Sequence, residues 1–164
     1  MKKLCFIVLL LLVGCTSDDE IGGFYIDTQS TYHLMNTNDE DLLDSTVENS
    51  FLKSKIRVEH QNSNGNFIEF YQSNLDSYYD YFIYELNGYN SFVLLNQVSD
   101  DFINNNKIVS VIKWNSSEQD TIITQVYRTD RLTLKKKVWV NGELKYDVDN
   151  GLVPEIITIK KNHL

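Results

Sequence analysis

Four Asn-Gly dipeptides divide this chain into short runs and constrain its fold more than any other feature. Their glycines are Gly65, Gly88, Gly142 and Gly151. Asn-Gly suits the central positions of a tight hairpin turn, where both residues need a positive φ. The runs that flank the first three are rich in β-branched and aromatic residues, and many alternate between apolar and polar positions, as strands with one buried face do. These runs are Phe51–His60, Asn66–Gln72, Tyr78–Leu86, Tyr89–Val98, Leu132–Val140 and Leu144–Asp147.

Four more runs have the same strand-like composition, whereas the helical signal is weak. The runs are Phe24–Asp27, Lys107–Trp114, Thr121–Arg128 and Glu155–Lys160. Only residues 39–45 and 99–105 favour a turn or two of helix, the second with Ser99 as N-cap. About eight to ten short strands at hairpin spacing predict an all-β fold, an antiparallel β-sandwich of the immunoglobulin-like kind. A small lipocalin-like β-barrel is the alternative, less favoured because the hairpins are uneven in length.

The first 15 residues predict an export signal. Two lysines precede an apolar run of 10 residues, Leu4–Val13, which is far shorter than the ~20 residues that span a bilayer. Leu12-Val-Gly-Cys15 resembles the lipobox of bacterial lipoproteins, which implies cleavage after residue 14 and acylation of Cys15. Two or more acyl chains anchor a protein stably, at ~0.8 kcal/mol per buried CH₂. We therefore expect a signal peptide over 1–14, an acylated tether over 15–23 and one all-β domain over 24–164.

The acidic run after the cysteine bears on location. Ser17, Asp18, Asp19 and Glu20 resemble the signal that takes lipoproteins of the Bacteroidetes group to the outer face of the outer membrane. We therefore predict a lipid-anchored protein of the outer membrane, displayed on the cell surface. The alternative is a plain acidic tether and a protein on the periplasmic face.

Charge and cysteine content exclude several classes of function. Loss of Lys2 and Lys3 with the signal peptide moves the net charge from −8 to about −10, which disfavours binding to a phosphate backbone. Of the two cysteines, Cys5 leaves with the signal peptide and Cys15 carries the lipid. Thiol catalysis, disulfides and cysteine-ligated zinc are therefore excluded from the mature domain, and the covalent lipid is the only cofactor expected.

No sequence motif of a known catalytic centre is present, so we predict a protein without catalytic activity. His33, His60 and His163 are far apart in the sequence, and an ordinary strand histidine is preferred over a general base or ligand for His33 and His60. A carboxylate-based glycan hydrolase is the enzyme alternative. It would need two acids ~5 to 9.5 Å apart, with Glu69, Asp80 and Glu85 as candidates.

Two short motifs permit further interpretations. Asp147-Val-Asp-Asn-Gly151 resembles the opening of a calcium loop, but glycine comes at the fifth position, so a hairpin turn is the preferred interpretation.

Asp44-Ser-Thr46 and Asp120-Thr-Ile122 resemble the acceptor motif for O-glycosylation of exported Bacteroidetes proteins, which implies that both lie on exposed loops.

Aromatic density marks the candidate binding face. Six of the ten tyrosines lie between residues 71 and 89, and strand alternation places Tyr79 and Tyr81 on the opposite face from Tyr84 and Phe82. An exposed tyrosine offers flat apolar area with a polar tip, which suits a sugar ring or a partner protein. The candidate binding face consists of Tyr78, Tyr79, Tyr81, Tyr84 and Tyr89.

These features together predict a non-catalytic binding module on a lipid anchor. The partner would be a glycan or a protein, and the oligomeric state stays open. An interaction protein of the cell envelope, for immunity or assembly, is the alternative. Segments such as Ile112-Lys-Trp-Asn115 and Val138-Trp-Val-Asn-Gly-Glu143 resemble small Bacteroidetes lipoproteins, a resemblance that implies no activity and no site residues.

Overall fold

A computed structural model describes residues 24–73, 77–96 and 99–162, which form two facing β-sheets. Sheet A contains β1 (Tyr25–Asp27), β3 (Arg57–Gln61), β4 (Phe67–Glu69), β7 (Lys107–Lys113), β8 (Gln119–Arg128), β9 (Leu132–Val140) and β10 (Glu143–Asp147). Sheet B contains β2 (Ser30–Asn36), β5 (Tyr81–Leu86), β6 (Tyr89–Leu94) and β11 (Ile156–Lys161). Two 3-10 helices, η2 (Phe51–Lys53) and η3 (Asp100–Phe102), lie in the connections.

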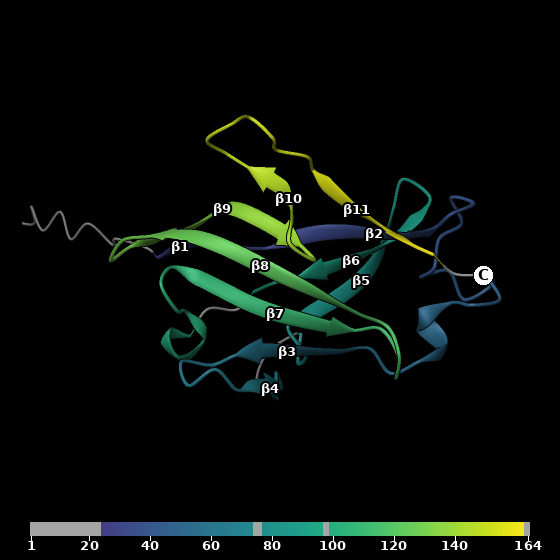
Figure 1. Ribbon diagram of the computed structural model, residues 1–164, viewed down its shortest axis with the longest axis horizontal. Coiled ribbons are helices and arrows are strands. Elements are labelled where there is room, and N and C mark those ends of the chain that lie inside the picture. Colours follow the sequence, from purple (N-terminus) through teal and green to yellow (C-terminus); the bar gives the residue numbers. More distant parts are fainter. Residues whose placement is uncertain (1–23, 74–76, 97–98, 163–164) are drawn as a thin grey trace, which may run out of the picture.

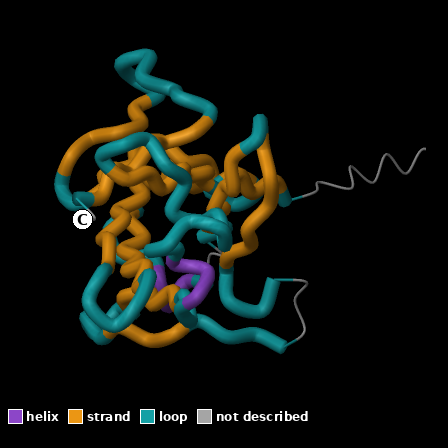
Figure 2. Tube along the Cα trace, turned by 90° about the vertical axis from the view of Figure 1, so that its right-hand side faces the viewer, coloured by secondary structure: helices purple, strands orange, loops and turns teal. Residues whose placement is uncertain are grey.

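The order of the strands confirms the predicted all-β fold. Sheet A runs β1-β9-β8-β7-β3-β4, with β10 also paired to β9, and sheet B runs β11-β2-β6-β5 (Figure 1). Figure 2 shows the same strands in orange, from the side. Most neighbours are antiparallel, as predicted for a sandwich. The first and last strands are the exceptions, because β1 pairs in parallel with β9 and β11 pairs in parallel with β2. Both sheets are therefore mixed.

Two of the Asn-Gly dipeptides adopt the predicted turn geometry. Asn87 and Gly88 have φ of 55° and 81° between β5 and β6, and Asn141 and Gly142 have φ of 50° and 84° between β9 and β10. At Gly65 and Gly151 only the glycine has a positive φ. These turns fix the register of the hairpins, because a two-residue loop leaves no freedom for strand slippage.

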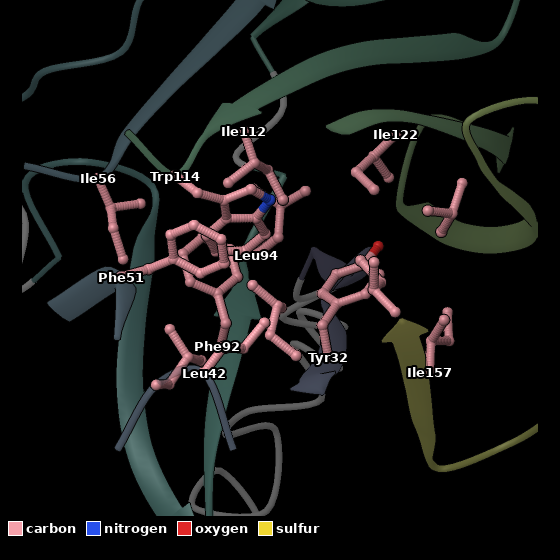
Figure 3. Close-up of a cluster of buried hydrophobic side chains, with 14 of the residues drawn as sticks. Tyr32, Leu42, Phe51, Ile56, Phe92, Leu94, Ile112, Trp114, Ile122 and Ile157 are labelled. Carbon is pink, nitrogen blue, oxygen red and sulfur yellow. The ribbon is translucent and has the colours of Figure 1, made fainter. Parts of the chain in front are cut away.

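Apolar side chains from both sheets fill the space between them (Figure 3). Trp114 lies at the centre of an aromatic group, with ring centroids 4.9 Å from Phe92 of β6 and 5.9 Å from Phe51 of η2. Ser50 caps η2, since its hydroxyl accepts a hydrogen bond from the Leu52 N–H. This layer is the hydrophobic core of the domain.

The main departure from the predicted elements is β2, for which the sequence analysis predicts no strand. Tyr32 and Leu34 of this strand are fully buried between the sheets. The predicted run Phe51–His60 begins with η2, and its strand starts at Arg57. Of the two segments predicted to be helical, residues 39–45 form turns instead, and η3 occupies part of residues 99–105. Among the described residues, no helix combines the length and the apolar composition required to cross a membrane.

Candidate functional site

The outer face of sheet B carries a group of exposed aromatic rings. Phe82 and Tyr84 of β5 are 42% and 39% exposed, and Tyr89 of β6 is 41% exposed. They share this face because Phe82 pairs with Val93, Tyr84 with Ser91, and Leu86 with Tyr89, whereas the alternate positions meet the core. We call Phe82, Tyr84, Tyr89 and His33 the outer aromatic face.

His33 of β2 joins this face through polar and ring contacts. Its Nε2 lies 3.0 Å from the Ser91 hydroxyl, and its ring centroid is 5.3 Å from that of Tyr89. Partial burial lowers the pKa of His33, and the nearby Asp41 carboxylate only partly offsets this, so the imidazole is neutral at pH 7. The ring of His33 therefore contacts that of Tyr89 and places a polar group beside it.

The predicted tyrosines divide into three groups. Tyr84 and Tyr89 belong to the outer aromatic face. Tyr81 points the other way: its ring stacks on Phe92 at 4.8 Å, and its hydroxyl donates to the Ile56 carbonyl at 3.1 Å. Tyr78 and Tyr79 precede β5, and both lie beside the ring of Tyr71, at 6.3 and 5.4 Å.

The five tyrosines predicted as the binding face do not include Phe82 and His33, which the structure places on the outer aromatic face. The sequence does indicate Phe82, because it lies two positions before Tyr84 in the strand and therefore on the same face. No such indication exists for His33, because its place on the face depends on β2 pairing with β6, a contact between residues about 60 positions apart in the chain.

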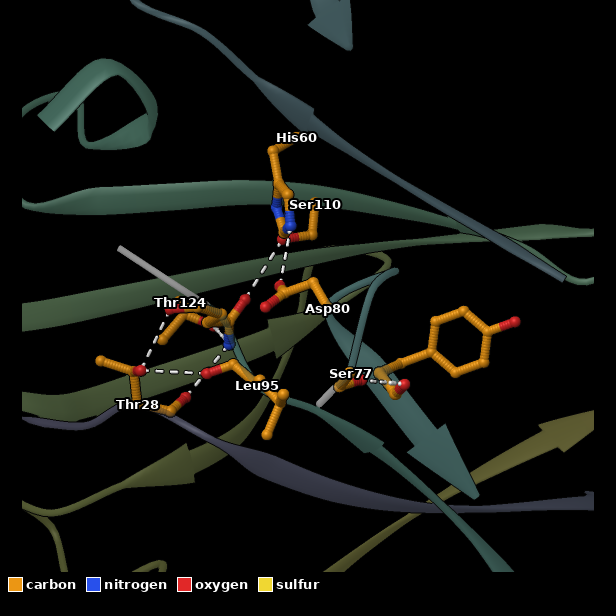
Figure 4. A network of polar contacts seen from close by, with 9 residues as sticks. Thr28, His60, Ser77, Asp80, Leu95, Ser110 and Thr124 are labelled. Carbon is orange, nitrogen blue, oxygen red and sulfur yellow. Dashed lines mark hydrogen bonds and ion pairs between the residues drawn. The ribbon is translucent and has the colours of Figure 1, made fainter. Parts of the chain in front are cut away.

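A second concentration of functional groups is buried between the sheets (Figure 4). His60 Nε2 lies 2.8 Å from Asp80 Oδ2, and His60 Nδ1 lies 2.9 Å from Ser110 Oγ. Asn96 Nδ2 donates to the Thr28 carbonyl and to Thr124 Oγ1. The members of this inter-sheet polar network, none more than 3% exposed, are Thr28, His60, Asp80, Asn96, Ser110 and Thr124.

The network connects both sheets through two residues with unusual backbone conformation. Asp80 precedes β5 and Asn96 follows β6, with φ of 63° and 53°. Aspartate and asparagine tolerate this left-handed region better than other residues with a side chain. Their side chains reach across to His60, Ser110 and Thr124 of sheet A.

Ser110, His60 and Asp80 are the residue types of a catalytic triad, and all three lie in the interior of the domain. Because both Asn96 N–H groups donate elsewhere, its Oδ1 accepts from the Ser110 hydroxyl at 3.3 Å. His60 Nδ1 lies 2.9 Å from Ser110 Oγ, and His60 Nε2 lies 2.8 Å from Asp80 Oδ2, so the imidazole bridges the hydroxyl and the carboxylate. Each of the three is at most 1% exposed, so the cluster is closed to solvent in the described structure.

A second buried carboxylate, Asp120, lies at the start of β8. It accepts hydrogen bonds from Trp114 Nε1 at 2.5 Å, Asn141 Nδ2 at 2.7 Å and Lys161 Nζ at 2.8 Å. The segment Asp120–Ile122 therefore lies within a strand, with its first and last residues buried, and the expectation of an exposed loop there is wrong. Asp44–Thr46 lies in a turn, where Asp44 Oδ1 accepts from the Thr46 N–H at 2.8 Å.

The acidic side chains at the end of β10 and in the loop after it are paired with lysines. Asp147 Oδ2 accepts from Lys137 Nζ at 3.0 Å and from Asn150 Nδ2 at 2.7 Å, and Asp149 Oδ1 lies 2.5 Å from Lys136 Nζ. The Asp147 Oδ1 atom accepts the Asp149 N–H, as in a turn. These contacts match the hairpin-turn interpretation of Asp147–Gly151. Within the described part of the chain, no three His, Cys, Asp or Glu residues are placed to hold a metal ion.

The acids considered for glycan hydrolysis have separate environments. Asp80 bonds to His60 in the interior, Glu69 pairs with Lys55 at 3.8 Å on sheet A, and Glu85 is exposed on β5 opposite Asn90. The structure brings Glu69 instead beside Glu59, its register partner in β3. Glu59 is bonded to Lys113 at 2.5 Å, so this pair serves ion pairing on the outer surface of sheet A.

Several predicted sites lie outside the described residues. These are Cys15, the acidic residues Ser17, Asp18, Asp19 and Glu20, and His163. In comparisons with protein-family models, with curated proteins and with solved structures, nothing matched this chain.

Proposed function

We propose that this protein is a lipid-anchored binding module without catalytic activity, displayed on the surface of the bacterial outer membrane. The observation that carries the proposal is the outer aromatic face, where three large rings stay exposed on a regular pair of strands. Burial of such rings stabilises a core, so their exposure side by side is unusual unless another molecule covers them.

The chemistry of this face favours a glycan as ligand. Sugar rings present apolar faces that stack on aromatic rings and hydroxyl groups that need polar partners. Phe82 and Tyr84 lie with ring centroids 5.8 Å apart, and His33, Thr31 and Thr158 bring polar groups to the same surface. A flat sheet face with separate rings suits an extended chain of sugars.

The binding experiment uses fluorescently labelled soluble polysaccharides on intact cells that produce the protein, compared with permeabilised cells. We expect intact cells to bind at least one polysaccharide. A Phe82→Ala/Tyr84→Ala variant should bind at least tenfold more weakly, a loss of about 1.4 kcal/mol. Tyr127→Ala is the matched control, because Tyr127 is 50% exposed on sheet A.

Two outcomes would contradict parts of this proposal. Unchanged binding by the double variant would move the contact surface away from the outer aromatic face. Binding only after permeabilisation would place the protein on the periplasmic side, where the acidic run after Cys15 is a tether alone.

A protein partner is the second candidate, favoured by the position of β5 at the edge of sheet B. An edge strand can pair with a strand of another protein, and the adjoining rings would give that pairing side-chain contacts. Cross-linking from position 84 distinguishes the two: a specific protein adduct without any polysaccharide binding supports an immunity or assembly role.

A further inference from the structure

β1 and Phe24, the residue before it, expose large apolar side chains to solvent. Phe24, Tyr25 and Ile26 are 80%, 58% and 59% exposed, although all three are strongly apolar or aromatic. Tyr25 and Ile26 project from opposite faces of the strand, and more than half of each residue is exposed, so the domain covers neither face of β1 fully. The strand is held to the domain by its parallel pairing with Leu132–Leu134 of β9, where the Tyr25 N–H donates to the Arg131 carbonyl at 2.9 Å.

We propose that Phe24, Tyr25 and Ile26 form a membrane-contacting edge that inserts into the headgroup region of the bilayer carrying the lipid anchor. This inference rests on the proposed acylation of Cys15. Phenylalanine and isoleucine partition into the acyl boundary, and tyrosine is enriched at the level of the headgroups. The edge therefore has the composition of an interfacial anchor.

The position of this edge in the chain supports the lipid surface as its partner. Eight residues lie between Cys15 and Phe24, so an extended tether reaches at most about 30 Å, and a flexible one averages ~15–18 Å. Acyl chains in the bilayer thus hold these side chains near the surface at high effective concentration. A contact too weak to bind a free protein would then orient the domain.

The charge of the protein indicates how this contact is made. The mature chain carries a net charge of about −10, so anionic headgroups repel the domain as a whole. Arg128 of β8 lies near the edge, but its guanidinium is paired with Asp100 at 2.5 Å. The contact is therefore apolar, and high salt should not release it.

Because β1 and the outer aromatic face belong to different sheets, membrane contact through β1 leaves the outer aromatic face of sheet B accessible to a ligand. The acylated tether and the membrane-contacting edge would hold one end of the domain against the bilayer.

The experiment uses the acylated full chain, purified in detergent and reconstituted into vesicles of phosphatidylethanolamine and phosphatidylglycerol, with or without lipids brominated on the acyl chains. A Phe24→Trp variant reports contact at β1, and Tyr84→Trp is the matched control on sheet B. The wild type gives the background from Trp114 and Trp139. We expect brominated lipid to quench the added fluorescence of Phe24→Trp at least twofold, in low and in high salt, and to leave that of Tyr84→Trp unchanged.

Flotation of the same vesicles separates the two proposals. Vesicle-bound protein without extra quenching in Phe24→Trp overturns the membrane-contacting edge and leaves the lipid anchor intact. A blue-shifted Phe24→Trp emission that bromine does not quench also overturns it, because a second copy of the chain then covers β1. Protein that does not float overturns the anchor and the edge together.

Discussion

At the scale of single residues, two tyrosines of the core differ in how their hydroxyl groups are satisfied. The Tyr32 hydroxyl is buried and, although the Ser30 side chain acts on it, makes no hydrogen bond of normal geometry among the described residues, whereas that of Tyr81 donates to the Ile56 carbonyl. A buried polar group without a partner costs about 1–3 kcal/mol. The two hydroxyls therefore make opposite contributions to the free energy of unfolding.

Removal of each hydroxyl tests this difference. We expect Tyr32→Phe to leave the free energy of unfolding in urea unchanged or to raise it by up to about 1 kcal/mol. Tyr81→Phe should lower it by about 0.5–1.5 kcal/mol, since a hydrogen bond is lost. Equal losses in both variants would mean that the Tyr32 hydroxyl is bonded, for example to a buried water.

At the scale of elements, the hairpins were predictable from the sequence and β2 was not. Asn87-Gly88 and Asn141-Gly142 mark their turns locally, and the runs beside them alternate in period 2. The segment Ser30–Asn36 has a half-buried histidine and polar residues at both ends, and no turn dipeptide next to it. It is a strand because β6 and β11 pair with its two sides, which is a contact between distant parts of the chain.

The candidate site was predictable to a similar extent. Alternation along β5 groups Phe82 with Tyr84 and separates both from Tyr81. The alternation alone does not say which group faces the core, because that depends on the side of sheet B on which sheet A packs. In the structure this is the side of Tyr81, which is half-buried against Phe92 and Ile56. The inter-sheet polar network had no sequence signal, because its members come from six separate segments of the chain.

The loop between β10 and β11 makes the domain sensitive to acid. Burial opposes the ionisation of Asp147, but hydrogen bonds from Lys137, Asn150 and the Asp149 N–H outweigh it and hold the pKa of Asp147 below its ordinary value. A carboxyl group with a lowered pKa stabilises the folded state above its unfolded pKa of ~3.9, and this contribution is lost as the pH falls through the folded pKa.

A pH series of unfolding free energies checks this effect. We expect Asp147→Asn to be less stable than the wild type at pH 7, with the difference shrinking as the pH falls below about 4. Asp149→Asn is the control, because Asp149 is 49% exposed and should show a smaller difference at pH 7. A difference for Asp147→Asn that is constant from pH 7 to pH 2 would contradict the argument.

At the scale of the whole molecule, two kinds of contact join the sheets. The apolar layer around Trp114 is non-directional, whereas the inter-sheet polar network requires each donor to meet its acceptor. His60 and Asp80 are the two ionisable members of this network, with 2.8 Å between His60 Nε2 and Asp80 Oδ2, and both side chains are at most 1% exposed. The stability of the sandwich therefore depends on keeping this pair intact.

Loss of one partner should weaken the sandwich as a unit. His60→Leu removes the imidazole from its buried pair with Asp80, and loss of one partner of such a pair costs about 3–5 kcal/mol, a large part of the ~5–15 kcal/mol that stabilises a domain. Ser110→Ala removes only a neutral hydroxyl and should cost about 1 kcal/mol. Because the network spans both sheets, unfolding of His60→Leu should remain one transition, with tryptophan fluorescence and far-UV circular dichroism shifted to the same lower urea concentration. Separate transitions by the two probes would show that the sheets unfold independently and that the network does not couple them.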